Sequence, residues 1–150
     1  MGNRLFAAYG VGVNRAEMAQ RCPTAKLLGE STLRNHRLTF RGAHAAAVAN
    51  IEPAKGCSVP VLVWEITPAD EAALDLYVGF PPLHEKHQFR LRLDGKVVAC
   101  MAYVMRDDRP LGKPSAFYYS ALLEGYKAAG FDPEILMKAV QNENEEVSDL

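Results

Sequence analysis

A short apolar segment followed at once by two glycines constrains the fold more than any other feature of this sequence. Leu5–Tyr9 is apolar throughout, which predicts a strand buried on both faces. Glycine at Gly10 and Gly12 permits either a positive φ or the close approach of another group. Asn14 is a good N-cap residue, and a short helix is expected over Arg15–Arg21. The sequence therefore predicts a buried strand that leads through a glycine loop into a helix.

The loop Tyr9–Asn14 is also a candidate anion-binding site. Free N–H groups where a loop enters a helix attract a carboxylate or a phosphate. A tight strand–helix turn with no ligand explains the same glycines, so both interpretations stay open here. The spacing matches neither the phosphate-loop pattern nor the dinucleotide fingerprint.

The composition is that of an ordinary globular chain. With 150 residues, 49% of them hydrophobic and 23% charged, the chain is long enough to bury one core, and one domain is expected over residues 1–150. A formal net charge of −1 gives no bulk attraction for nucleic acid. No membrane span or signal peptide is recognisable, so a cytoplasmic protein is expected. Cys22, Cys57 and Cys100 lack metal-ligand spacing, which predicts reduced thiols and no metal site.

A second strand and helix follow in the middle of the chain. Val59–Ile66 is the strongest strand pattern in the sequence. Thr67 is expected to cap the next helix, with Asp70 in the capping-box position, and the helix is expected to end near Gly79. The predicted apolar face of this helix consists of Leu74, Tyr77 and Val78.

The remaining segments complete an α+β prediction. The expected elements are strand, turn and strand over Ala25–Phe40, a loop over Arg41–Asn50, a turn over Pro53–Ser58, and a hairpin of His87–Leu93 and Val97–Met105. One helix is capped by Ser115 and ends at Gly130, a second begins at Asp132-Pro133, and the acidic tail over residues 143–150 is expected to fray. This order indicates a curved or barrel-like sheet rather than a doubly wound parallel one.

Several short motifs, taken together in order, resemble those of one family. They are Tyr9-Gly10 with the loop to Asn14, Cys22-Pro23-Thr24-Ala25, Phe40-Arg41-Gly42, Val59–Ile66, Leu74-Asp75 with Gly79 and Pro81, and Pro114-Ser115 with Tyr118. From about Leu5 to Val140 the chain is similar to the gamma-glutamylcyclotransferase-like (AIG2-like) proteins. The resemblance implies a small mixed β-barrel with flanking helices and a pocket at one end.

The resemblance also implies a reaction and a set of site residues. In the family, the Tyr-Gly loop binds the α-carboxylate and amine end of a gamma-glutamyl substrate, and a glutamate on the capped helix is the acid/base. The α-amine attacks the γ-carbonyl, which gives 5-oxoproline and releases the attached amine or peptide without a metal or organic cofactor. The candidate substrate-binding residues are Tyr9, Gly10, Val11, Gly12, Val13, Ser115 and Tyr118.

The chain departs from the family pattern at three places, one of which is Leu83–Lys86, where the family typically reads Leu-Tyr-Arg-Lys. The family's usual Tyr-Gly-Ser-Asn reads Tyr9-Gly10-Val11-Gly12, so a hydroxyl and an amide are missing from the loop. The family's Leu-Asp-x-x-Glu-Gly reads Leu74–Gly79, with Val78 at the position of the expected acid. Valine cannot carry a proton, and losing a positioned acid/base costs about 10²–10⁴-fold in rate. The nearby candidates for a substitute are Asp75, Glu85, His84 and His87.

Three functions follow from these departures. The sequence predicts a pocket that binds a small anionic metabolite, a gamma-glutamyl compound or another small anion, without turning it over. The first alternative is an active cyclotransferase that uses Asp75 or Glu85 as its acid. The second alternative is a protein-interaction role in which side chains fill the pocket. No nucleic-acid or membrane partner is expected.

Overall fold

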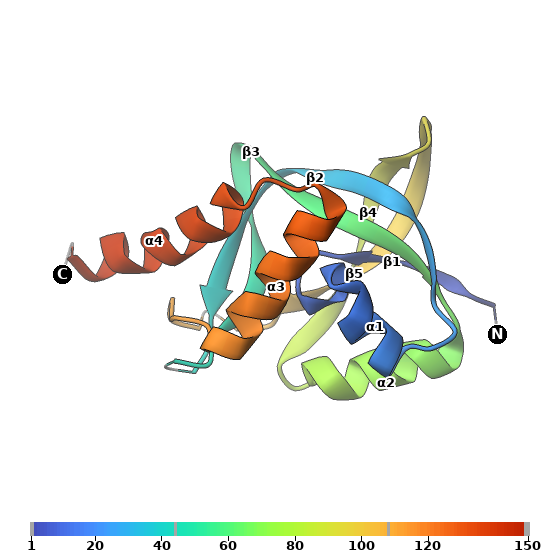
Figure 1. Ribbon diagram of the computed structural model, residues 1–150, viewed down its shortest axis with the longest axis horizontal. Coiled ribbons are helices and arrows are strands. Elements are labelled where there is room, and N and C mark those ends of the chain that lie inside the picture. The colour runs from blue at the N-terminus through green and yellow to red at the C-terminus, as the bar shows by residue number, and fades with distance from the viewer. Residues whose placement is uncertain (1, 44, 108, 149–150) are drawn as a thin grey trace.

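The computed structural model describes residues 2–43, 45–107 and 109–148, in which the strands form one mixed sheet with helices packed against it (Figure 1). The strands are β1 (Arg4–Ala8), β2 (Lys26–Arg41), β3 (Val48–Ile66), β4 (His84–Leu93) and β5 (Lys96–Met105). The helical elements are the 3₁₀ turn η1 (Val11–Val13), α1 (Arg15–Arg21), α2 (Pro68–Val78), α3 (Ala116–Ala129) and α4 (Glu134–Ser148). The predicted α+β class is confirmed.

The short strand β1 lies at the centre of the sheet. The strand order is β2-β3-β1-β5-β4, and β1 pairs antiparallel with β3 and parallel with β5. Phe6, Ala7 and Ala8 are buried, as expected for a strand covered on both faces. The glycine loop therefore begins at the end of the central strand of the sheet.

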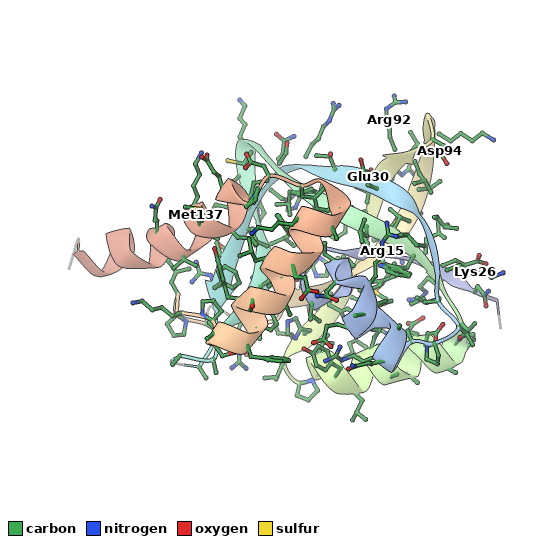
Figure 2. The ribbon with its side chains drawn as sticks, viewed as in Figure 1. Arg15, Lys26, Glu30, Arg92, Asp94 and Met137 are labelled. Atoms are coloured by element: carbon green, nitrogen blue, oxygen red, sulfur yellow. The ribbon has the colours of Figure 1, made fainter. Side chains whose placement is uncertain are left out.

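The sheet curls without closing, so the term barrel applies only loosely. Its two edge strands, β2 and β4, form no ladder with each other in the described residues. They still approach closely, because the Ser31 hydroxyl donates to the carbonyl oxygen of Arg92 at 2.5 Å. Figure 2 shows Arg92 and Asp94 near the outer end of the β4–β5 hairpin, where Asp94 and Gly95 take positive φ as the predicted turn requires.

Two predicted turns lie inside long strands, and these predictions are wrong. β2 runs without a break through Ala25–Phe40 except at its first residue, and β3 runs through Pro53–Ser58. The turn-forming residues are absorbed by a bulge, since the pairing register shifts at Asn35, opposite residues 54–57. Asn35 takes a φ of 61°, and its side chain accepts a hydrogen bond from the Gly56 N–H at 3.1 Å. Local turn chemistry thus bends a strand without ending it.

The helix α2 forms as the sequence predicts. The Thr67 hydroxyl accepts from the Asp70 N–H at 3.1 Å, and the Asp70 carboxylate accepts from the Thr67 N–H at 3.0 Å. The same carboxylate accepts from the Thr24 hydroxyl at 2.7 Å, which ties the start of α2 to the segment after α1. Gly79 ends the helix in the left-handed conformation. These contacts fix the direction in which the last turn of α2 faces.

The C-terminal helices also begin where they were predicted. The Ser115 hydroxyl accepts from the Tyr118 N–H at 3.1 Å and caps α3, which ends at Gly130. The helix α4 continues to Ser148, so the backbone of the acidic stretch from Glu143 is helical in this structure up to that residue. Fraying of this tail stays a prediction, and residues 149–150 lie outside the described residues.

An ion pair joins β2, β3 and the segment that precedes α3. The Arg41 guanidinium donates to both oxygens of Glu52 and to the carbonyl oxygen of Arg109 at 2.7 Å. The Thr39 hydroxyl donates to the same carboxylate at 2.5 Å. Burial alone would raise the pKa of Glu52, but the hydrogen bonds from Arg41 and Thr39 outweigh it and hold that pKa below its usual range.

We expect Glu52→Gln to lower the free energy of unfolding by about 1–3 kcal/mol at pH 7, because it removes charge-assisted hydrogen bonds from a mostly buried arginine. The lowered pKa means that this stability is present above the usual glutamate range and is lost as the pH falls through the folded-state pKa. Urea unfolding from pH 7 down to about pH 3.5 measures the difference between variant and wild type. A difference that grows on acidification would contradict this account.

Candidate functional site

A cavity of about 360 Å³ lies where the glycine loop, α1 and α2 meet. In Figure 1, α1 and α2 lie side by side. The loop contributes Tyr9, Gly10, Val11 and Gly12, and apolar side chains from β1, α1 and the start of β3 complete most of the wall. Sites for small molecules have such apolar walls with a few polar groups.

The glycine loop is held from three sides. The buried Trp64 indole of β3 donates to the Gly12 carbonyl oxygen at 3.0 Å. The Tyr9 hydroxyl donates to a carbonyl oxygen of β5 at 2.6 Å. Asn14 caps α1 through its side-chain oxygen and donates through its amide nitrogen to a carbonyl oxygen of α3 at 2.9 Å. These contacts give the loop one fixed path beside the cavity.

Close packing, and not positive φ, explains the two loop glycines. A Cβ on Gly12 would lie 2.9 Å from the Ala8 Cβ, and one on Gly10 would lie 3.3 Å from the Tyr118 hydroxyl. Neither glycine has a positive φ. The first hydrogen bond inside η1 runs from the Val13 N–H to the Gly10 carbonyl oxygen at 2.9 Å, so the amides of Val11 and Gly12 have no partner within this turn.

Of the other predicted binding residues, Tyr118 lines the cavity, whereas Val13 and Ser115 do not. Tyr118 lines the cavity, and its hydroxyl accepts from the Ala49 N–H at 3.1 Å. Burial raises the pKa of Tyr118, which keeps the phenol protonated at neutral pH. Val13 is buried but does not line the cavity, and Ser115 serves as the cap of α3 away from it.

The predicted apolar face of α2 points to the cavity. Leu74, Tyr77 and Val78 all line it, so the position expected to carry the family's acid does lie at the cavity wall. The His84 Nδ1–H donates to the Val78 carbonyl oxygen at 2.8 Å. Burial lowers the pKa of His84 below its ordinary value, so this pocket-lining imidazole is neutral at pH 7, with Nε2 as its basic nitrogen.

The structure does not bring the two predicted substitute acids to the cavity wall. Asp75 accepts from the Tyr103 hydroxyl at 2.5 Å and from the Lys86 ammonium at 3.0 Å. Tyr103, which lines the cavity, links Asp75 to it. Glu85 lies at the start of β4, where its carboxylate contacts His87 Nε2 at 2.8 Å and Arg106 Nη1 at 3.5 Å.

Two charged residues of α1 that no sequence motif singled out also line the cavity. Glu17 and Arg21 lie one helical turn apart, and the Arg21 guanidinium lies 3.8 Å from the centre of the Tyr77 ring on α2. The i, i+4 spacing after the Asn14 cap was the available signal. That spacing says which residues share a face, but only the packing of α1 on α2 turns the face inward.

The described residues contain no candidate metal cluster, no helix that could span a membrane and no disulfide. In residues 2–43, 45–107 and 109–148, no group of three or more metal-ligating side chains is placed to hold a metal ion. None of the helices described here has the length and apolar character needed to cross a membrane. Cys22 and Cys100 are buried, Cys57 is exposed, and all are free.

Comparison with known proteins identifies the family. The sequence model described as "Gamma-glutamyl cyclotransferase, AIG2-like" matches residues 6–121. The chain belongs to the gamma-glutamyl cyclotransferase, AIG2-like family. This confirms the resemblance seen in the motifs. A comparison with curated proteins found no match.

Solved structures share the fold of this AIG2-like protein at low sequence identity. A structure titled gamma-glutamyl cyclotransferase is 22% identical, with a TM-score of 0.80 over 91% of this chain and 86% of its own. An uncharacterized protein from Homo sapiens is also 22% identical, with a TM-score of 0.81 over 93% and 87% of the two chains. A yeast gamma-glutamyl cyclotransferase specific to glutathione is 12% identical, with a TM-score of 0.66 over 97% of each chain.

A third glycine, on α3, sets how closely that helix approaches the loop. A Cβ on Gly125 would lie 2.8 Å from the backbone nitrogen of Asn14 and 2.8 Å from the carbonyl carbon of Val13. Backbone atoms cannot rotate away as a flexible side chain can. The glycine is therefore required for α3 to support the loop from behind.

We expect Gly125→Ala to lower the free energy of unfolding by about 1–3 kcal/mol, because the added methyl group overpacks the contact between α3 and the loop. Alanine otherwise favours a helix over glycine, so a packing effect opposes the intrinsic preference. The exposed Ala128→Ser on the same helix is the control and should change stability by less than about 0.5 kcal/mol. Urea unfolding measures both, and a stabilised Gly125→Ala variant would disprove the close contact.

Proposed function

We propose that this protein binds a small anionic metabolite in the cavity beside the glycine loop and does not convert it to 5-oxoproline. The support for binding is a cavity of about 360 Å³ whose wall includes the Val11 and Gly12 segment, with main-chain amides left free by the turn. Hydrogen-bond donors of the main chain suit a carboxylate. Val11 and Gly12 replace polar side chains of the family's loop, so the ligand is expected to differ chemically from the family's substrate.

The absence of turnover rests on one observation, the position of Val78. This residue lines the cavity at the place where the family resemblance puts the acid/base. A carboxylate there would move a proton from the substrate ammonium to the leaving nitrogen, and valine offers no group for that transfer. Neither Asp75 nor Glu85 lines the cavity, which weakens the case for either as a direct substitute.

A second candidate is a cyclotransferase that uses a different acid/base. The observation that favours it is the presence of Glu17 and His84 in the cavity wall. His84 is neutral near pH 7 and has a basic Nε2, as a general base requires. This candidate predicts 5-oxoproline formation that is lost in Glu17→Gln or in His84→Gln. The cavity itself argues against a third function, an interaction protein with a filled pocket.

An assay for 5-oxoproline with a panel of gamma-glutamyl amines and peptides separates the candidates. We expect the wild type to form no more 5-oxoproline than the uncatalysed background, and Val78→Glu to form it at least about 10²-fold faster than that background, because residue 78 lines the cavity. Leu76→Glu is the matched control. Leu76 is 86% exposed on the same helix, so this substitution adds the same charge outside the cavity.

The outcomes of that assay are distinct. Activity in Val78→Glu but not in Leu76→Glu supports an intact pocket that lacks only its acid. Turnover by the wild type overturns the binding-only proposal and favours the second candidate. A Val78→Glu variant that folds but stays inactive on the whole panel counts against a pocket of the family's substrate geometry.

A further inference from the structure

The carboxylate of Glu17 is an unusual polar group in an apolar cavity. Its side chain is only 13% exposed and lines the cavity together with Phe6, Met18 and Leu74. In the part of the chain that the structure describes, neither of its carboxylate oxygens accepts a hydrogen bond. A carboxylate that is mostly buried, lines a cavity and has no donor within the fold keeps its acceptor capacity for a ligand.

The neighbouring arginine balances the charge without supplying those hydrogen bonds. The closest approach between Arg21 and the Glu17 carboxylate is 3.7 Å, beyond hydrogen-bond distance. The same Arg21 nitrogen, Nη1, donates to the main-chain oxygen of Glu17 at 3.0 Å, and the guanidinium is stacked on the Tyr77 ring at 3.8 Å. The carboxylate therefore remains open to a donor that arrives through the cavity.

A primary ammonium group meets the demands of this position best. It brings a positive charge and three donors, and charge-assisted hydrogen bonds are roughly twice as strong as neutral ones. Tyr118 lines the same cavity, and aromatic rings attract a cation. The largely apolar remainder of the wall, including Val48 and Val78, suits a carbon skeleton.

From these contacts we infer that Glu17 is a specificity-determining residue that accepts the ammonium group of the ligand. The ligand class is then a small molecule with a primary ammonium, an apolar carbon skeleton and the anionic group of the proposed function. This inference rests on the proposed function, since it assigns chemistry to a ligand of the same cavity. It goes beyond that proposal in assigning the ammonium of the ligand to one side chain of α1.

Three probes of matched length test the inference. Norleucine has an ammonium, a carboxylate and an apolar chain, hexanoate lacks the ammonium, and hexylammonium lacks the carboxylate. Each is titrated into ¹⁵N-labelled protein while the amide signals of Gly10 and Gly12 are followed. Wild type is compared with Glu17→Gln and with Glu30→Gln, a control with the same charge change at an exposed residue of β2 outside the cavity (Figure 2).

We expect norleucine to bind the wild type more tightly than hexanoate does. Glu17→Gln should weaken norleucine and hexylammonium about tenfold or more and leave hexanoate no weaker, as expected for the loss of one charge-assisted hydrogen bond. Glu30→Gln should leave all three unchanged. If Glu17→Gln fails to fold, Glu17→Asp, which withdraws the carboxylate by one methylene, should weaken the same two probes.

Two negative results separate this inference from the proposed function. Equal binding of norleucine and hexanoate, or ammonium probes that bind Glu17→Gln as tightly as the wild type, overturns the role of Glu17 and leaves a binding cavity in place. No shift with any probe overturns the inference and counts against the proposed function as well.

Discussion

The contact between the glycine loop and the elements around it is the constraint on which the site depends. The Trp64 indole holds the Gly12 carbonyl oxygen from β3, and Gly125 lets the backbone of α3 approach the loop from behind. Because Gly12 itself has no room for a Cβ beside Ala8, the loop has little freedom to take another path. Its position in turn defines one wall of the cavity, and the central strand β1 delivers it there.

The other wall depends on how α2 is fixed at its two ends. The capping box of Thr67 and Asp70 sets the start of the helix, and the Thr24 hydroxyl ties that start to the segment after α1. Gly79 and the His84 bond to the Val78 carbonyl oxygen set the end. The result is a helix face whose residue 78 faces the cavity with an apolar side chain. The scaffold is that of the family, and valine stands where the resemblance implies the acid.

The sequence predicted the elements with strong local signals and missed those decided by long-range pairing. The cap at Asn14, the capping box of α2 and the cap at Ser115 are local hydrogen-bond patterns, and each is confirmed. The residues of Pro53–Ser58 have the composition of a turn, yet pairing with β2 keeps them in a bulged strand. Turn propensity is a weak local preference, and it is overridden here because the residues before and after this segment of β3 both pair with β2.

The same division holds for the candidate site. The sequence by itself determined the family, the glycine loop and the valine at the position where the resemblance implies the acid, because motifs, their order and residue identity are properties of the chain alone. Only the tertiary structure decided which polar groups share the cavity, because that depends on how α1 packs against α2. It put Glu17 and His84 in the wall and left Asp75 and Glu85 out of it, since helix spacing fixes a face but not what the face meets.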